Sequence, residues 1–304
     1  MKTPRNNLLS NVYSPINNSL ENVKDEISDL SKSYNNEKHL PFLSQLLEYS
    51  LNSSGKKLRP TLSLLSAGFG NQNLKTVEKL AAAVELLHIA TLVHDDTVDD
   101  SNFRRGKATI SNLWGDNSAV LIGDYIFAAS ATQVCATGNI RVIRRFSETI
   151  MELSLGELQE MEINFDWETN LSNYLERIYN KTASLFSTSA QSGAILSGCD
   201  EESIKSLQSY GYNIGMAFQI VDDILDFQGK EDEVGKPTGS DLSNGILTLP
   251  SIYALESDSN SRFVSMFDQK NSSPLLISEF AKFVASSKSL ERALSTDTKN
   301  TKEA

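Results

Sequence analysis

Two acidic segments of the chain share a spacing that could bind metal ions. Both have the pattern Asp-Asp-x-x-Asp, one at Asp95–Asp99 and one at Asp222–Asp226. On a helix, carboxylates at positions i and i+4 project from one face, so each segment offers a two-pronged set of oxygen ligands. Mg²⁺ prefers such oxygens and completes its shell with phosphate oxygens. The spacing therefore predicts magnesium sites that act on a polyphosphate. The alternative, a solvated acidic helix end, is disfavoured by the second copy of the motif.

Basic residues that could contact a diphosphate accompany these segments. Arginine forks match phosphate oxygens, and Gly106 after Arg105 suggests a loop where the backbone can approach an anion. His88 lies two helical turns before Asp95 and therefore on the same face. The candidate anion contacts are Lys56, Arg59, His88, Arg104, Arg105, Lys181, Thr182 and Lys236. Each of them alone is an ordinary surface or core residue, and only the whole set indicates a site.

Charge and cysteine content exclude several other classes of protein. The chain has 39 acidic and 28 basic residues, a net charge of −11, which argues against nonspecific binding of nucleic acid. Cys135 and Cys199 form no CxxC or Cys/His cluster, so reduced thiols and a cytoplasmic location are expected. The apolar stretch 80–93 is interrupted by Glu85 and His88, and we expect a buried helix there and no membrane span.

Long helices are the elements that must position these side chains. With 16 Gly and 7 Pro among 304 residues, the chain contains few helix breakers. Apolar residues at steps of three or four predict helices over about 7–33, 74–94, 115–137, 141–164, 171–196 and 201–227. No repeat or linker composition is evident. We therefore predict one all-α domain over residues 1–304, with an N-terminal helix within about 1–35 and a polar tail at 295–304.

In these features the chain resembles the trans-isoprenyl diphosphate synthases, specifically their polyprenyl diphosphate synthase branch. The resemblance rests on ordered segments at 55–60, 85–88, 94–99, 104–106, 123–124, 156–157, 181–183, 218–226, 235–237 and 239–242. It implies an isoprenoid-synthase helical bundle around a central cavity, usually assembled as a homodimer. It also implies a Mg²⁺-dependent prenyltransferase that condenses an allylic diphosphate with isopentenyl diphosphate by ionisation, condensation and proton elimination.

The resemblance also assigns roles to individual residues. It implies that Asp95, Asp99 and Asp222 hold a cluster of three Mg²⁺ ions, with Asp96, Asp223 and Asp226 as nearby or water-mediated ligands. The residues that it places on the allylic diphosphate are Arg104, Lys181, Gln219 and Lys236, with Thr182 beside them. The residues that it places on isopentenyl diphosphate are Lys56, Arg59, His88 and Arg105. The six carboxylates, together with Lys181 and Lys236, form the implied catalytic set.

Small residues near the first motif bear on the length of the product. Ala90 and Thr91 occupy the positions five and four before Asp95, where bulky aromatic residues close the cavity in members of this family that make short products. Ala131 is also small. We therefore expect a medium- or long-chain polyprenyl product, of about octaprenyl length or longer. A farnesyl or geranylgeranyl product is the alternative, because a neighbouring helix could close the same space.

Three other functions compete with a homomeric synthase. A terpene cyclase shares a first motif of this kind but normally has a different second metal motif and needs no isopentenyl pocket. A noncatalytic subunit should have lost the Asp pairs, which this chain retains. The chain could still be the catalytic half of a heterodimeric synthase.

Overall fold

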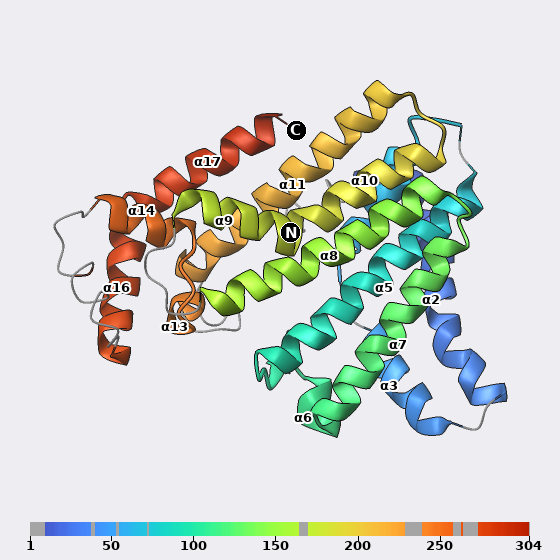
Figure 1. The fold of residues 1–304 in the computed structure, drawn as a ribbon, viewed down its shortest axis with the longest axis horizontal. Helices are drawn as coiled ribbons and strands as arrows, with labels where there is room; N and C mark the ends of the chain where they lie inside the picture. Colours follow the sequence, from blue (N-terminus) through green and yellow to red (C-terminus); the bar gives the residue numbers. More distant parts are fainter. Residues whose placement is uncertain are drawn as a thin grey trace, which may run out of the picture. The chain divides into compact units, whose positions relative to one another are not determined.

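The computed structural model describes residues 10–37, 40–52, 55–71, 73–163, 170–228, 239–257, 263 and 273–303. The described chain is built almost entirely of helices, as the spacing of apolar residues predicts (Figure 1). Its strands in these ranges are one short antiparallel hairpin, β1 (Phe103–Arg104) and β2 (Lys107–Ala108). The predicted all-α class is confirmed.

The chain divides into two compact units, and each is described by itself. Unit 1 comprises Met1–Ser147 and Thr188–Gln208, and unit 2 comprises Glu148–Ser187 and Ser209–Ala304. The divisions fall within helices α8 (Ile140–Glu162), α10 (Ser184–Leu196) and α11 (Glu201–Gln228). That residues 1–304 form a single domain stays a prediction.

Unit 1 is organised around a long central helix, α5 (Leu74–Val98). Residues Leu80 to Leu87 of this helix are all buried, which explains the nearly unbroken apolar run in the sequence. The elements around it are η1 (Ser14–Ile16), α2 (Asn17–Glu37), α3 (Pro41–Leu51), α4 (Leu58–Ala67), α6 (Ile110–Trp114) and α7 (Asp116–Cys135). Helices α2, α4 and α7 pack directly on α5, and α7 runs beside it in Figure 1.

Helix α7 is long and apolar enough to cross a membrane by length and composition, the single such helix in the described ranges. A helix of a soluble core meets the same criterion, and α7 packs on α5 and contributes Ala119, Ile122 and Ile126 to the apolar core of unit 1. The stretch 80–93, for which a buried helix was expected, lies inside α5. The absence of a membrane span stays a prediction.

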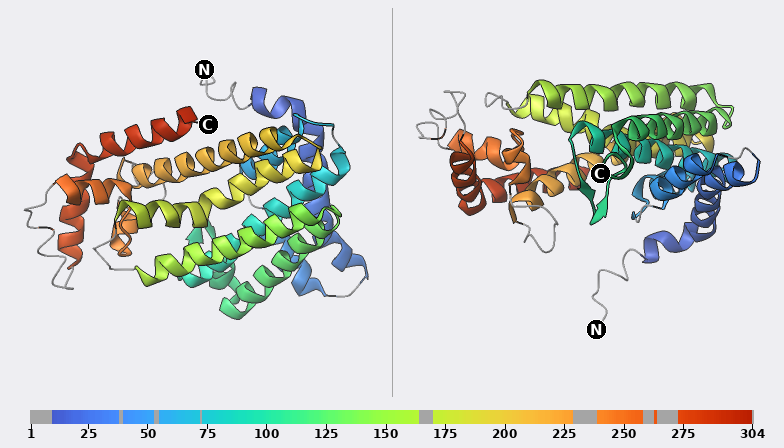
Figure 2. Two further views of the ribbon diagram at one scale, coloured as in Figure 1. Left: turned by 45° about the horizontal axis from the view of Figure 1, so that its top comes forward. Right: turned by 90° about the horizontal axis from the view of Figure 1, so that it is seen from below.

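Unit 2 has its own apolar core between α11 and the C-terminal helices. Its elements include α9 (Leu171–Ile178), the π-helical turn η2 (Tyr179–Ala183), α13 (Ser240–Ser243), α14 (Leu249–Ser257), α16 (Pro274–Ser286) and α17 (Ser289–Glu303). Ile220, Ile224 and Phe227 of α11 meet the buried faces of α14 and α16 there. Helices α9 and α10 join through η2 without a break (Figure 2). Residues 295–303, expected as a polar tail, continue α17.

Candidate active site

The first acidic motif lies at the C-terminal end of α5. Asp99 caps the helix, and its N–H donates to the Asp95 carbonyl at 2.8 Å. Asp100 then adopts a left-handed backbone conformation with φ 49°, and the N–H of Ser101 donates to the Asp96 carbonyl at 2.9 Å. This is a Schellman ending, in which glycine is the usual left-handed residue. It places the carboxylates of Asp95, partly exposed, and Asp99, exposed, on the last turn of the helix.

The second carboxylate of this motif has a different environment. Asp96 is buried, and its Oδ1 accepts from Nε of Arg104 at 2.6 Å. Arg104 ends β1, and Arg105 and Gly106 form the turn of the hairpin with φ 51° and 75°. The ion pair therefore ties the hairpin to α5, and Asp96 is engaged with Arg104, the residue expected on the allylic diphosphate.

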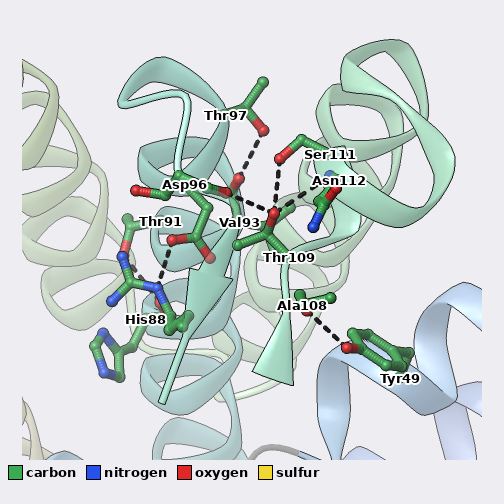
Figure 3. A network of polar contacts seen from close by, with 12 residues as sticks. Tyr49, His88, Thr91, Val93, Asp96, Thr97, Ala108, Thr109, Ser111 and Asn112 are labelled. Carbon is green, nitrogen blue, oxygen red and sulfur yellow. Dashed lines mark hydrogen bonds and ion pairs between the residues drawn. The ribbon is translucent and has the colours of Figure 1, made fainter. Parts of the chain in front are cut away.

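A network of hydroxyl groups holds the other strand of this hairpin (Figure 3). The Thr109 hydroxyl donates to the Ser101 carbonyl at 2.6 Å. It also accepts from the N–H of Asn112, so Thr109 caps the N-terminus of α6. Tyr49 of α3 donates to the carbonyl of Ala108 at 2.6 Å. The hairpin is thus held at the C-terminal end of β2.

Three of the four residues expected on isopentenyl diphosphate lie in one positively charged cluster of unit 1. Arg59 lies in the first turn of α4, His88 lies in the middle of α5, and Arg105 lies in the hairpin turn. Burial lowers the pKa of Arg59 to about 10, an effect that Glu85 opposes and Arg105 reinforces. Arg105 acts on Arg59, and both arginines act on the His88 imidazole, so the fold brings these three residues near one another from three separate elements.

His88 is the titratable group inside this cluster. Removal of the imidazole from water is the first cause that lowers its pKa well below 6.5. The cations that lower it further are Arg59, Arg105, Arg104 and Lys57. The imidazole is therefore neutral at pH 7 and has one N–H donor and one nitrogen acceptor.

The loop before α4 is anchored by residues that the sequence did not single out. Lys57 adopts φ 51°, and its Nζ donates to Oε1 of Glu85 at 2.9 Å, a largely buried ion pair. Tyr13 donates to the carbonyl of Lys56 at 2.5 Å, while Lys56 itself is exposed. These contacts fix the backbone beside Arg59. No local signal in the sequence pairs Glu85 with Lys57, because the two residues meet only through the packing of α4 on α5.

The second acidic motif lies near the end of α11 in unit 2, and its three carboxylates differ in exposure. Asp222 is exposed and Asp223 is buried. Asp226 accepts hydrogen bonds from the N–H and hydroxyl of Ser240 at 3.1 and 2.8 Å, so it caps the short helix α13. Asp226 therefore joins the start of α13 to α11. Asp222 is the most exposed carboxylate of this motif.

Asp223 joins two of the predicted substrate-binding residues in a chain of hydrogen bonds. Its Oδ2 accepts from the Tyr174 hydroxyl at 2.6 Å, and its Oδ1 accepts from the Gln219 amide nitrogen at 2.8 Å. The Gln219 amide oxygen in turn accepts from the Thr182 hydroxyl at 2.7 Å. Burial, followed by the nearby charge of Asp241, raises the pKa of Asp223 to about 8.

Lys181 lies in the π-helical turn η2 beside helix α8. Its Nζ lies 3.1 Å from Oε1 of Glu157 and 2.6 Å from Oε1 of Glu160. The turn reaches α8 because residue 156 is glycine, where a Cβ would lie 2.6 Å from the Lys181 nitrogen. Turns of this kind often mark functional sites in helices. The sequence pointed to Lys181, and Glu157 lies in a segment of the resemblance, but no local signal pairs Glu157 or Glu160 with Lys181.

The remaining candidates are Lys236 and the three residues expected to bear on product length. Ala90 is buried in the core of unit 1, whereas Thr91 and Ala131 are partly exposed. Lys236 lies outside the described residues. Within the described part of the chain, no three His, Cys, Asp or Glu side chains are grouped so that they could hold a metal ion by themselves.

Comparison with known proteins identifies the class to which this fold and these motifs belong. The family model for polyprenyl synthetase matches residues 40–284, which span parts of both units. The chain therefore belongs to the polyprenyl synthetase family, a family of prenyltransferases, and the predicted resemblance and enzyme class are confirmed.

Individual relatives support this placement. The chain is 41% identical over 244 residues to heptaprenyl diphosphate synthase component 2 of Bacillus subtilis, covering 80% of this chain and 69% of that protein. It is 39% identical over 214 residues to octaprenyl diphosphate synthase of Escherichia coli, covering 70% and 66%.

Solved structures agree with the fold. Heptaprenyl diphosphate synthase from Staphylococcus aureus has a TM-score of 0.87 and 35% identity, covering 94% of this chain and 89% of that one. A decaprenyl diphosphate synthase from Rhodobacter capsulatus has a TM-score of 0.88 and 31% identity, covering 97% and 90%. The isoprenoid-synthase helical bundle is thereby confirmed.

Proposed function

We propose that this protein extends an allylic diphosphate with isopentenyl diphosphate to a medium- or long-chain polyprenyl diphosphate. The observation that carries the proposal is the cluster of Arg59, His88 and Arg105 in a chain that also carries two Asp-Asp-x-x-Asp motifs. The motifs suit a diphosphate that leaves, and the cluster suits a second diphosphate that is retained. Relatives named heptaprenyl and octaprenyl diphosphate synthase support the chain length.

The exposed carboxylates fit magnesium. Asp99 and Asp222 are exposed and Asp95 is partly exposed, so hard oxygen ligands are accessible on α5 and on α11. We assign Asp95, Asp99 and Asp222 as the residues that hold Mg²⁺, with three ions as the number to be tested. When bound, the ions neutralise the allylic diphosphate and stabilise pyrophosphate as it departs.

The basic residues bind and orient the two substrates. Arg104, Lys181, Gln219 and Lys236 hold the allylic diphosphate, and Lys56, Arg59, His88 and Arg105 hold isopentenyl diphosphate. The carbon–oxygen bond of the allylic diphosphate breaks, the isopentenyl double bond attacks the allylic cation, and a proton passes to the departing pyrophosphate. Because the chain supplies fixed charges and no covalent nucleophile, its contribution is electrostatic.

A product assay tests this function. The purified protein is incubated with Mg²⁺, labelled isopentenyl diphosphate and an allylic primer, and the products are separated by chain length. We expect a ladder that ends at heptaprenyl length or beyond. A ladder that stops at farnesyl or geranylgeranyl would overturn the chain length, and no elongation by the protein alone would overturn a homomeric enzyme.

We propose a cytoplasmic homodimer as the active form. Two relatives are named as component 2 of heptaprenyl diphosphate synthase, which favours a heterodimer as the second candidate. Light scattering together with the product assay distinguishes them. A dimer of this chain that elongates the primer supports the homodimer, whereas an inactive protein that gains activity with a second subunit from the same cell supports the heterodimer.

A further inference from the structure

Unit 2 buries a tyrosine that is not among the predicted substrate-binding residues. Tyr174 is fully buried in α9 of unit 2, and its hydroxyl reaches Oδ2 of Asp223 at 2.6 Å. Its ring lies 5.8 Å from the Arg177 guanidinium, which donates to the Leu247 carbonyl at 2.9 Å. The ring is therefore held by packing, and a phenylalanine would fill the same space. Packing alone therefore does not explain why this side chain carries a hydroxyl group.

The Tyr174 hydroxyl fixes the orientation of the Gln219 amide, because both groups are hydrogen-bonded to the Asp223 carboxylate. With Oδ2 of Asp223 engaged by Tyr174, Oδ1 accepts from the nitrogen of the Gln219 amide at 2.8 Å. The amide oxygen then points the other way and accepts from the Thr182 hydroxyl at 2.7 Å. An amide nitrogen carries two hydrogens, so Gln219 can offer the second one to an anion.

The same chain of bonds ends in the turn that carries Lys181. Thr182 lies in η2 directly after Lys181. The turn is also packed closely on α11, because a Cβ at Gly215 would lie 2.5 Å from Cα of Ala183. Because η2 packs closely on α11 and is hydrogen-bonded to Gln219, a shift of the Asp223 carboxylate also shifts the Gln219 amide and η2.

We propose that Tyr174 is a positioning residue for allylic diphosphate binding, acting through Asp223 on the Gln219 amide and on the turn that carries Lys181. The inference rests on the proposed function, in which Gln219 and Lys181 contact that diphosphate. Tyr174 has no predicted contact with isopentenyl diphosphate, whose residues lie in unit 1. The effect of its hydroxyl is therefore specific for one substrate.

The test compares Tyr174→Phe with a matched control, Tyr253→Phe. Tyr253 is also buried in unit 2, and its hydroxyl bonds to Thr296 at 3.1 Å, so the control also removes one buried hydroxyl. We expect Tyr174→Phe to raise the KM for the allylic primer and the Kd for Mg²⁺-pyrophosphate about tenfold, the size expected for loss of one buried hydrogen bond that orients the Gln219 amide. The KM for isopentenyl diphosphate should stay within about twofold of wild type, and the control should change neither constant.

A double variant separates positioning from a structural role. Added to Gln219→Ala, the Tyr174→Phe change should have no further effect on the allylic KM, because the amide on which it acts is gone. Additive effects, or a Tyr174→Phe protein that differs from wild type only in Tm, would overturn the inference. If Tyr174→Phe does not fold, Thr182→Val breaks the same chain of bonds at its far end and should give the same selective shift.

Different results would refute the proposed function and the positioning role of Tyr174. If wild type elongates no primer, alone or with a second subunit, the proposed function is wrong, and pyrophosphate binding by calorimetry still tests the role of Tyr174. If wild type elongates normally and Tyr174→Phe resembles Tyr253→Phe, only the positioning role is wrong.

Discussion

At the scale of single residues, the two acidic motifs separate into exposed and structural carboxylates. Asp96 is paired with Arg104, Asp223 is bonded to Tyr174 and Gln219, and Asp226 caps α13. The spacing of the motifs gave no sign of this difference, because partners such as Tyr174 and Ser240 lie outside the motifs and reach them only in the folded chain. Asp99 and Asp222, two of the three residues to which the resemblance assigns metal, are exposed, and the third, Asp95, is partly exposed.

The first prediction tests the assignment of metal ligands. Asp95→Asn and Asp222→Asn should each lower kcat/KM on the order of 10²–10³-fold, the effect of losing one electrostatic contact to the transition state. The far-ultraviolet circular dichroism should stay helical. Asp29→Asn, which removes an exposed carboxylate paired with Lys32 on α2, is the control and should keep full activity. Wild-type activity in either motif variant would refute the assignment.

The second prediction concerns the neutral imidazole of His88. Its pKa is lowered in the folded chain, so as the pH falls below 6.5 the unfolded chain takes up a proton that the folded chain does not. Stability is therefore present above pH 6.5 and is lost below it, by up to about 1.4 kcal/mol per pH unit. Thermal melts between about pH 7.5 and pH 5.5 should show a smaller loss of Tm for His88→Gln than for wild type.

The control for this prediction is His94→Gln, which removes the other histidine in the described ranges. The His94 Nε2 lies 3.4 Å from Oδ1 of Asp124, so the melts of this variant measure the part of the pH dependence that arises outside the charged groups around His88. Those charged groups are Arg59, Arg104, Arg105 and Lys57. Parallel melting curves for His88→Gln and wild type would contradict the prediction.

At the scale of elements, the helices could be predicted from apolar spacing and their joints could not. The predicted helices 74–94 and 115–137 correspond to α5 (Leu74–Val98) and α7 (Asp116–Cys135). The predicted helix 171–196 contains a π turn, and the loop expected at Arg105 is the turn of a hairpin. Both features depend on contacts with other elements, such as the Asp96–Arg104 ion pair, which spacing does not encode.

The third prediction belongs to the end of α5. Asp100 has a left-handed conformation that costs a residue with a Cβ about 1 kcal/mol, and its negative charge is unfavourable at a helix C-terminus. Asp100→Gly should therefore raise Tm by about 2 °C. Asp100→Ala removes the charge and keeps the Cβ, so it should gain less. A lower Tm for the glycine variant would show that the carboxylate has a stabilising partner.

At the scale of the whole molecule, the length of the product depends on space beyond single side chains. Ala90, one of the residues expected to set that length, lies in the core of unit 1 with 1% of its surface exposed. A large side chain there must displace neighbouring core residues. Thr91 is partly exposed, and its hydroxyl donates to the His88 carbonyl at 2.9 Å.

The fourth prediction follows from this contrast. Ala90→Phe should destabilise the fold by about 1–3 kcal/mol, the usual cost of overpacking, and lower Tm. Thr91→Phe should fold like wild type and shorten the product ladder. Chromatography of labelled products together with thermal melts checks both. An unchanged ladder for Thr91→Phe would exclude this side of α5 from the control of chain length.

The π turn η2 also constrains how this sequence can change. The turn accommodates one more residue than an α-helical turn would between α9 and α10. Deleting a residue from Tyr179–Ala183 would remove the extra residue and restore a regular α-helical turn, which would redirect the side chains within the turn while the helices on either side keep their register. Lys181 and Thr182 would then lose their register with Glu157 and Gln219. During evolution, Tyr179–Ala183 can therefore accept substitutions far more readily than insertions or deletions.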